Sequence, residues 1–313
     1  MIVHDAWVAG NGVHQLGEGP AWDDAARRLL WVDVAAGTVY IGRLDDDRVV
    51  EDARLEFGDT VGAVVPSSDG GLLVAGARTL HRVSPAGAVT AICDVIAAEV
   101  NSRLNDGACD PAGRFLAGTL CLGGPPGEEI LCQLRADDLS TIDDDLSLSN
   151  GLGWSPDGHH LYSVDSTPGT VWTRPYDPLT GRTGERRVLF RVPDGEPDGL
   201  CVDVDGHLWI AVWGAAEVRR YTLAGEIVAK IMLPAPHVTS VAFVGPERRT
   251  LLITTAREGL STEQLERHPL SGRLFLSKVD VTGVPTAPWA VLTEHSATDP
   301  PRRATPKLMG DTR

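Results

Sequence analysis

The same short pattern returns six times along this chain, and its spacing limits the fold more than any other feature. A small residue opens a run of mostly apolar residues, a polar turn follows, and a second apolar run comes next. The intervals between the small residues are 43, 45, 44, 48 and 41 residues. A repeat of about 40–50 residues with strand–turn–strand content is typical of a β-propeller, in which each repeat forms one blade. We therefore predict an all-β, six-bladed β-propeller with a central channel, its repeats anchored at Gly19, Gly62, Gly107, Gly151, Gly199 and Ser240.

The blades must close into a ring, because an open propeller would leave unpaired strand edges. We expect either residues 2–8 or a strand that starts near Val13 to pair with the last blade. Residues 261–267 are the best helix candidate, since they open with capping-box chemistry. The repeat spans nearly all of the 313 residues, which favours one domain over residues 1–296 and a disordered tail over residues 297–313.

Asp-Gly pairs stand between the first and second apolar runs of several repeats, at Asp69, Asp157 and Asp205. Asp-Gly between apolar runs favours a tight hairpin, because glycine adopts positive φ without steric cost. We assign these aspartates to turns and none of them to metal binding.

The residue before each anchor has the same place in every blade, so six side chains should surround the central axis. Three of them are carboxylic acids that would repel one another and lose hydration, so they need protons, basic partners or a cation. Carboxylate and amide oxygens suit Ca²⁺, Mg²⁺ or Mn²⁺, whereas Zn²⁺ is less natural without histidine. We therefore predict an axial site for one divalent metal ion. In chain order the six residues are Glu18, Val61, Asp106, Asn150, Asp198 and Thr239.

Composition and missing motifs exclude several classes of function. The net charge of −15 argues against a nucleic-acid partner, which would require a basic face. No apolar stretch is long enough to span a membrane and the first residues do not read as a signal peptide, so we expect a cytoplasmic protein. The five cysteines include no Cys-x-x-Cys pair. The chain also lacks a Gly-x-Ser-x-Gly elbow, a His-Glu-x-x-His motif and a phosphate-binding glycine loop.

Two further polar residues precede the third anchor. Arg103 and Asn105 would stand beside the predicted metal site. A guanidinium and a side-chain amide there could bind the hydroxyls or the carboxylate of a small ligand.

Several segments together resemble the regucalcin/gluconolactonase family, whose members include senescence marker protein and luciferin-regenerating enzyme. The similarity extends over about residues 13–280, and its motifs agree in order and spacing. They are residues 16–22, 103–115, 149–155, 197–203 and 254–260.

The resemblance implies a six-bladed propeller with one divalent metal on the channel axis, and hydrolysis of the lactones of sugar acids. It implies metal ligation by Glu18, Asn150 and Asp198, with calcium the favoured ion and zinc, manganese or magnesium as alternatives. It also implies that Arg103 and Asn105 bind substrate and that Asp198 acts as the general base.

One departure from the family concerns the substrate. Sugar lactonases of this family carry an acidic pair after the second strand of the third blade, and one acid binds substrate hydroxyls. Here residues 118–120 are followed by Cys121, Leu122 and Gly123, so the acid is absent. Glu128 and Glu129 are the nearest acids that could replace it.

The predicted function is a metal-dependent lactonase that acts on a small sugar lactone, as a monomer or small homo-oligomer. In this hypothesis the metal polarises the carbonyl and Asp198 activates water. Two alternatives stay open: a divalent-metal or ligand-binding propeller without turnover, and a hydrolase of a non-sugar lactone or ester.

Overall fold

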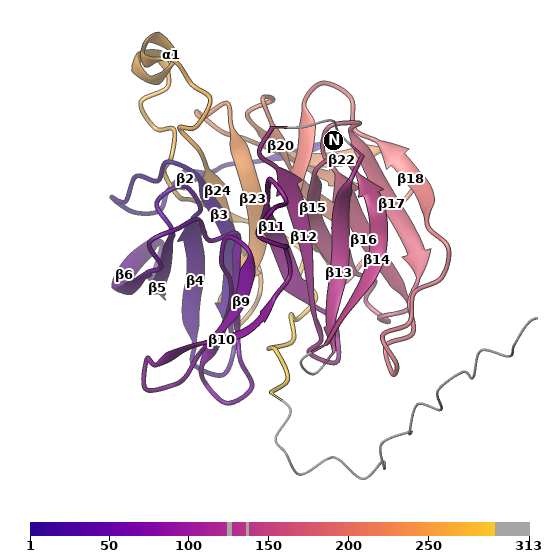
Figure 1. Ribbon diagram of the computed structural model, residues 1–313. Coiled ribbons are helices and arrows are strands. Elements are labelled where there is room, and N and C mark those ends of the chain that lie inside the picture. Colours follow the sequence, from indigo (N-terminus) through magenta and orange to yellow (C-terminus); the bar gives the residue numbers. More distant parts are fainter. Residues whose placement is uncertain (124–126, 136–137, 292–313) are drawn as a thin grey trace, which may run out of the picture.

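Six β-sheets surround a common axis in the computed structural model, which describes residues 1–123, 127–135 and 138–291 (Figure 1). Each sheet is one blade of four main strands, and consecutive strands pair antiparallel. The innermost strands contact one another in a closed cycle from the first blade to the sixth and back to the first. The prediction of a six-bladed, all-β propeller is therefore confirmed. These strands are β3 (Gly17–Asp23), β7 (Ala63–Pro66), β11 (Ser102–Cys109), β15 (Ser149–Trp154), β19 (Glu196–Val202) and β23 (Val238–Val244).

The remaining strands extend each blade outward in chain order. The second strands are β4 (Arg28–Asp33), β8 (Leu72–Ala75), β12 (Phe115–Cys121), β16 (His160–Asp165), β20 (Leu208–Trp213) and β24 (Thr250–Thr255). The third strands are β5 (Thr38–Asp45), β9 (Thr79–Val83), β13 (Glu129–Arg135), β17 (Thr170–Pro175), β21 (Glu217–Tyr221) and β25 (Phe275–Lys278). The fourth strands of the first five blades are β6 (Arg48–Glu56), β10 (Val89–Asp94), β14 (Asp138–Leu146), β18 (Arg187–Arg191) and β22 (Ile227–Met232).

The N-terminal segment supplies the outer strand of the last blade and so closes the ring. Strand β2 (Trp7–Val8) pairs antiparallel with β25, which confirms that residues 2–8 reach the last blade. Strand β1 (Ile2–His4) instead pairs parallel with β22 and adds a fifth strand to the fifth blade. Residues 5 and 6 separate the two short strands, so one segment ties the fifth blade to the sixth.

Apolar side chains fill the spaces between neighbouring blades. Between the fifth and sixth blades, for example, Trp209, Ile231 and Phe275 are almost fully buried with Phe243 packed among them. Both faces of most second strands are buried, as in β8 and β20. The core therefore consists of inter-blade layers and leaves the axis for other residues.

The small anchor residues allow the innermost strands to approach backbone to backbone. A Cβ atom at Gly62 would lie 2.1 Å from the carbonyl oxygen of Asn105 in the next blade. A Cβ atom at Gly151 would lie 2.4 Å from the carbonyl oxygen of Asp198. A side chain at either position would push the strands apart, which explains why the repeat has a small residue there.

Helix α1 (Thr262–Arg267) begins where the sequence predicts it. The Ser261 side chain accepts a hydrogen bond from the Gln264 backbone, and the Gln264 side chain accepts one from the Ser261 backbone. Among the described residues, no helix is long and apolar enough to cross a lipid bilayer. The single domain over residues 1–296 stays a prediction, and the tail at residues 297–313 lies outside the described residues.

Candidate active site

A cavity of about 240 Å³ opens at the axis of the propeller, at the end where the innermost strands begin. Most of its polar side chains are acids, amides or the arginine of the third blade. Apolar residues complete the wall. The lining residues are Leu16, Glu18, Arg103, Asn105, Leu120, Leu148, Asn150, Ser166, Glu196, Pro197, Asp198, Trp213 and Glu258.

Irregular pairing of the innermost strands directs polar side chains toward the axis. Five of these strands lose their regular antiparallel register within three residues of the position before the anchor. In β15 the shift lies between Asn150 and Leu152, and in β19 it lies between Pro197 and Leu200. Such bulges bend a strand locally and re-aim its side chains. At Glu18, Asn150 and Asp198 the irregularity coincides with a side chain that lines the cavity.

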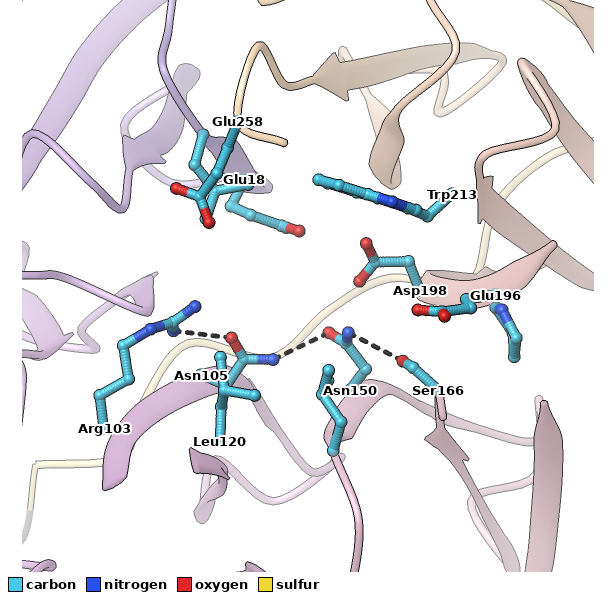
Figure 2. Close-up of a pocket in the computed structure, with 13 residues that line it drawn as sticks. Glu18, Arg103, Asn105, Leu120, Asn150, Ser166, Glu196, Asp198, Trp213 and Glu258 are labelled. Atoms are coloured by element: carbon cyan, nitrogen blue, oxygen red, sulfur yellow. Dashed lines mark hydrogen bonds between the residues drawn. The ribbon is translucent and has the colours of Figure 1, made fainter. Parts of the chain in front are cut away.

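Three of the six axial residues point into the same space. Figure 2 shows the carboxylates of Glu18 and Asp198 and the amide of Asn150 facing the middle of the cavity. Asn150 is 6% exposed and Asp198 is 7% exposed. One oxygen of Asp198, Oδ1, is buried and has no hydrogen-bond partner. A buried acceptor without a donor is costly, so this oxygen favours a proton or a cation beside it.

The other three axial residues do not line the cavity. Asp106 is partly buried and accepts a hydrogen bond from the Gly107 backbone at 2.7 Å. Val61 is fully buried in the core, and the Thr239 hydroxyl donates to the Gly17 carbonyl at 2.6 Å, which joins the sixth blade to the first. Three of the six ring positions therefore line the cavity, and the other three do not.

Burial and mutual repulsion raise the pKa values of the ring acids, so these acids resist ionisation. Burial, followed by the negative charge of Asp106, raises the pKa of Glu18 to about 8. Burial raises the pKa of Asp106 to about 6. Burial, followed by the charges of Glu18 and Asp106, also raises the pKa of Asp198 well above its ordinary value. Without a cation, the site would have to take up protons at neutral pH.

A chain of hydrogen bonds fixes the substrate-binding and metal-binding candidates relative to one another (Figure 2). Arg103 Nη1 donates to Asn105 Oδ1 at 2.7 Å. Asn105 Nδ2 donates to Asn150 Oδ1 at 3.3 Å, and Asn150 Nδ2 donates to the Ser166 hydroxyl at 3.1 Å. The Ser166 bond keeps the amide nitrogen of Asn150 away from the acids, so that its oxygen can face the cavity.

The donor set fits a divalent metal ion of the oxygen-preferring kind. Two carboxylates and an amide carbonyl supply oxygen ligands from three blades, and their negative charge has no ion-pair partner among the described residues. The three ring acids do not all have oxygens within 4.8 Å of one another, and the Asn150 amide is a further oxygen donor that faces the same cavity. The residues present therefore match the predicted ligands, and the ligation itself stays a prediction.

A second group of possible ligands lies at a hairpin of the fifth blade. Ligand atoms of Asp203, Asp205 and His207 lie within 4.8 Å of one another. The Asp203 carboxylate, however, accepts hydrogen bonds from two backbone amides, the Trp209 indole and Arg220. Asp205 also pairs with Arg220 at 2.9 Å. Arginine already compensates these acids, in agreement with the assignment of Asp205 to a turn.

Neither acid suggested as a replacement for the missing family acid reaches the cavity. Glu129 is buried and accepts a hydrogen bond from the Ser102 hydroxyl at 2.8 Å, and Glu128 is exposed outside the lining. Leu120 occupies the wall at that point. Glu196 and Glu258 are the additional acids of the cavity, and the sequence reasoning gave them no role.

Four lining residues to which the sequence reasoning gave no role share a signal that the sequence contains. Leu120, Ser166, Trp213 and Glu258 all lie at or just after the end of the second strand of a blade. A second repeat position therefore contributes to the cavity, next to the position before each anchor.

Comparison with known proteins identifies a family and agrees with the fold. A family model described as "SMP-30/Gluconolactonase/LRE-like region" matches residues 16–257. Regucalcin of Danio rerio is 34% identical over 281 residues, covering 87% of this chain and 94% of its own length. The putative sugar lactone lactonase YvrE of Bacillus subtilis is 30% identical, covering 88% of this chain and 95% of its own length.

A solved structure extends the comparison to three dimensions. The calcium-binding protein regucalcin of Agrobacterium tumefaciens superposes with a TM-score of 0.86 at 27% identity. The superposition covers 92% of this chain and 99% of the other. Because the family model spans most of the chain and the propellers superpose over nearly their full length, this chain belongs to the SMP-30/gluconolactonase/LRE-like family.

Proposed function

We propose that this protein is a metal-dependent lactonase that opens the lactone of a sugar acid. The observation that carries the proposal is the convergence of Glu18, Asn150 and Asp198 in one cavity, where neither carboxylate forms an ion pair with a basic side chain of the described residues. Family membership and the lactonase named among the relatives support the same chemistry. The cavity has room for a small molecule.

Glu18, Asn150 and Asp198 would hold one divalent metal ion, with calcium favoured and zinc, manganese or magnesium as alternatives. When bound, such an ion supplies Lewis-acid polarisation of a carbonyl group. Its charge would also allow Glu18 and Asp198 to lose their protons at neutral pH, since a neighbouring cation stabilises the carboxylate.

The protein's own side chains would carry out the remaining steps. Asp198 would accept a proton from the water that attacks the carbonyl carbon, a role worth roughly 10²–10⁴-fold in rate. Arg103 and Asn105 would orient the substrate, because their hydrogen bonds to each other fix both side chains at the cavity wall. The opened ring would leave as a hydroxy acid, and a cavity open to solvent permits its release.

The test is the Asp198→Ala variant, assayed with five- and six-membered lactones by pH-stat after metal removal and after addition of Ca²⁺, Mn²⁺ or Zn²⁺. We expect activity to depend on metal and to fall at least a hundredfold in the variant, with the circular dichroism spectrum unchanged. Elemental analysis should find about one ion per chain in the wild-type protein. Asp157→Ala, on an exposed hairpin, is the matched control and should change the rate less than twofold. Near-normal turnover by Asp198→Ala would contradict the role of Asp198 as general base.

A second candidate function is a calcium-binding propeller without turnover. It is favoured by the similarity to a calcium-binding protein and by residues 121–123, which have no acid where sugar lactonases of the family carry one. The same assay separates the candidates, since this one predicts metal in the protein and no hydrolysis of any lactone. Hydrolysis of unsubstituted lactones or esters alone would indicate a non-sugar substrate.

A further inference from the structure

We propose that Glu258 and Arg103 both hydrogen-bond to one hydroxyl group of the substrate, and that Glu258 therefore selects polyhydroxylated lactones. This inference rests on the proposed function and names the substrate class of the same cavity. Glu258 follows the second strand of the sixth blade, while Arg103 lies on the innermost strand of the third. Both side chains line the cavity, and Figure 2 shows the Glu258 carboxylate on the side where the Arg103 guanidinium lies.

Arg103 is a buried cation with unused donors. It is 7% exposed, and its Nη1 atom donates to the Leu104 carbonyl at 3.0 Å and to Asn105 Oδ1 at 2.7 Å. Among the described residues, nothing accepts from its Nη2 atom. A guanidinium has five N–H donors in a fixed plane, so part of this group stays available to a ligand.

Glu258 faces this cation without touching it. Its carboxylate is exposed, and no side chain in the described part of the structure pairs with it. Its negative charge is nevertheless the strongest of those that act on Arg103. The two charged groups line one cavity and form no direct ion pair, so a ligand group could contact both of them.

The backbone of Glu258 is held by hydrogen bonds, which fixes the point of the wall from which its side chain extends. The His237 ring Nδ1 bonds to the Glu258 carbonyl at 2.8 Å, and the Glu258 N–H donates to the Gln15 carbonyl at 2.9 Å. The His237 ring stacks on Trp213, with ring centroids 3.9 Å apart and planes inclined by 16°. Trp213 itself lines the cavity, so His237 connects the indole to the backbone of Glu258 on one side of the wall.

A hydroxyl group fits this gap better than other small groups. It donates one hydrogen bond, which the carboxylate accepts, and it accepts one, which the guanidinium donates. A ring with several hydroxyls could place one in the gap and lay its C–H face on the Trp213 indole. A lactone without hydroxyls would leave both charges unpaired, which costs binding energy.

The test compares Glu258→Ala and Glu258→Gln with the wild-type protein on two six-membered lactones, glucono-δ-lactone and δ-valerolactone. We expect Glu258→Ala to lower kcat/KM for the hydroxylated lactone about 10- to 100-fold and to change that for δ-valerolactone less than about threefold. Glu258→Gln should lie between the two. Glu196→Gln, another exposed acid of the cavity, is the matched control and should scale both lactones together. Equal effects of Glu258→Ala on the two lactones would overturn the inference.

A binding experiment separates this inference from the proposed function. 1,5-Anhydroglucitol has a hydroxylated ring but no carbonyl to hydrolyse, and tetrahydropyran is the same ring without hydroxyls. In calorimetry with metal present, Glu258→Ala should weaken anhydroglucitol binding at least tenfold. If neither lactone is hydrolysed but Glu258→Ala still weakens anhydroglucitol binding, the proposed lactonase activity is refuted and the hydroxyl-binding site is supported. Equal affinity of wild type and variant for anhydroglucitol would refute the site.

Discussion

Two groups of acids in this propeller differ in how their charge is balanced. At the hairpin of the fifth blade, Asp203 is fully buried but accepts from two backbone amides, an indole and Arg220. On the axis, Asp198 is nearly as buried, yet one of its oxygens has no donor and its acidic neighbours oppose its ionisation. Local geometry alone would favour the hairpin as the metal site. The comparison teaches that missing compensation, and not proximity of acids, distinguishes a binding site from a structural one.

The largest change in stability should come from replacing Asp203, the buried acid of the hairpin. Asp203→Ala would leave Arg220 and the Trp209 indole without their buried acceptor. Breaking a buried pair in this way typically costs about 3–5 kcal/mol, so the midpoint of urea unfolding should fall clearly. Asp205→Ala removes only the exposed partner of Arg220 and should cost less than about 1 kcal/mol. If the two variants were equally stable, the hairpin could not be called compensated.

Replacing the axial acid Asp198 should instead increase the stability of the fold. In metal-free protein at pH 8, Asp198→Asn removes a buried acid whose ionisation the fold opposes, so it should stabilise the fold by about 1–3 kcal/mol. Activity should be lost in the same variant. Thermal unfolding in a chelating buffer measures the gain, and added Ca²⁺ should raise the melting temperature of the wild type only. A less stable Asp198→Asn protein would contradict the view that the axial charge is uncompensated.

The third prediction concerns pH. The pKa of Glu18 is raised to about 8 in the folded protein, so the folded state holds a proton that the unfolded chain releases at lower pH. Metal-free protein should therefore lose stability as pH rises from about 5 to 8. Because Glu18 is partly exposed, the loss from this group should be only about 1 kcal/mol.

The difference between Glu18→Gln and the wild type isolates this contribution. The variant has no proton to lose, so its advantage in melting temperature should grow between pH 5 and pH 8. Saturating metal should cancel the growth, because a bound cation takes the place of the proton. A difference independent of pH would show that Glu18 ionises normally in the folded protein.

The sequence predicts the fold and the polar ring because both follow from a single period. The position before each anchor recurs, so Glu18 and Asp198 could be placed on one axis although 180 residues separate them. Their exact environment could not be predicted, since burial depends on how adjacent blades pack. Asp106 has the same repeat position as the other acids, but it lies outside the cavity wall.

The substrate side of the cavity was harder to foresee. Trp213 and Glu258 come from the ends of second strands, where the connection to the third strand of the same blade varies in length. Repeat periodicity fixes where such a strand ends, but the direction of a side chain in the following turn depends on local contacts. The stacking of His237 on Trp213 is one such contact, and it joins residues of two blades.

The smallest change should come from replacing Glu196, an acid at the edge of the axial group, and it concerns the pH dependence of the rate. Glu196 is exposed, and its charge is one of the weaker causes that raise the pKa of Asp198, after burial, Glu18 and Asp106. Glu196→Gln should make Asp198 easier to ionise, so the acid limb of the kcat/KM profile should move to lower pH. The rate at pH 6 should rise about two- to threefold at low salt and by less at 1 M salt, where exposed charges are screened. A shift that persists at 1 M salt would mean that Glu196 acts through contact or packing, and that the uncompensated charge of the axis extends to the rim.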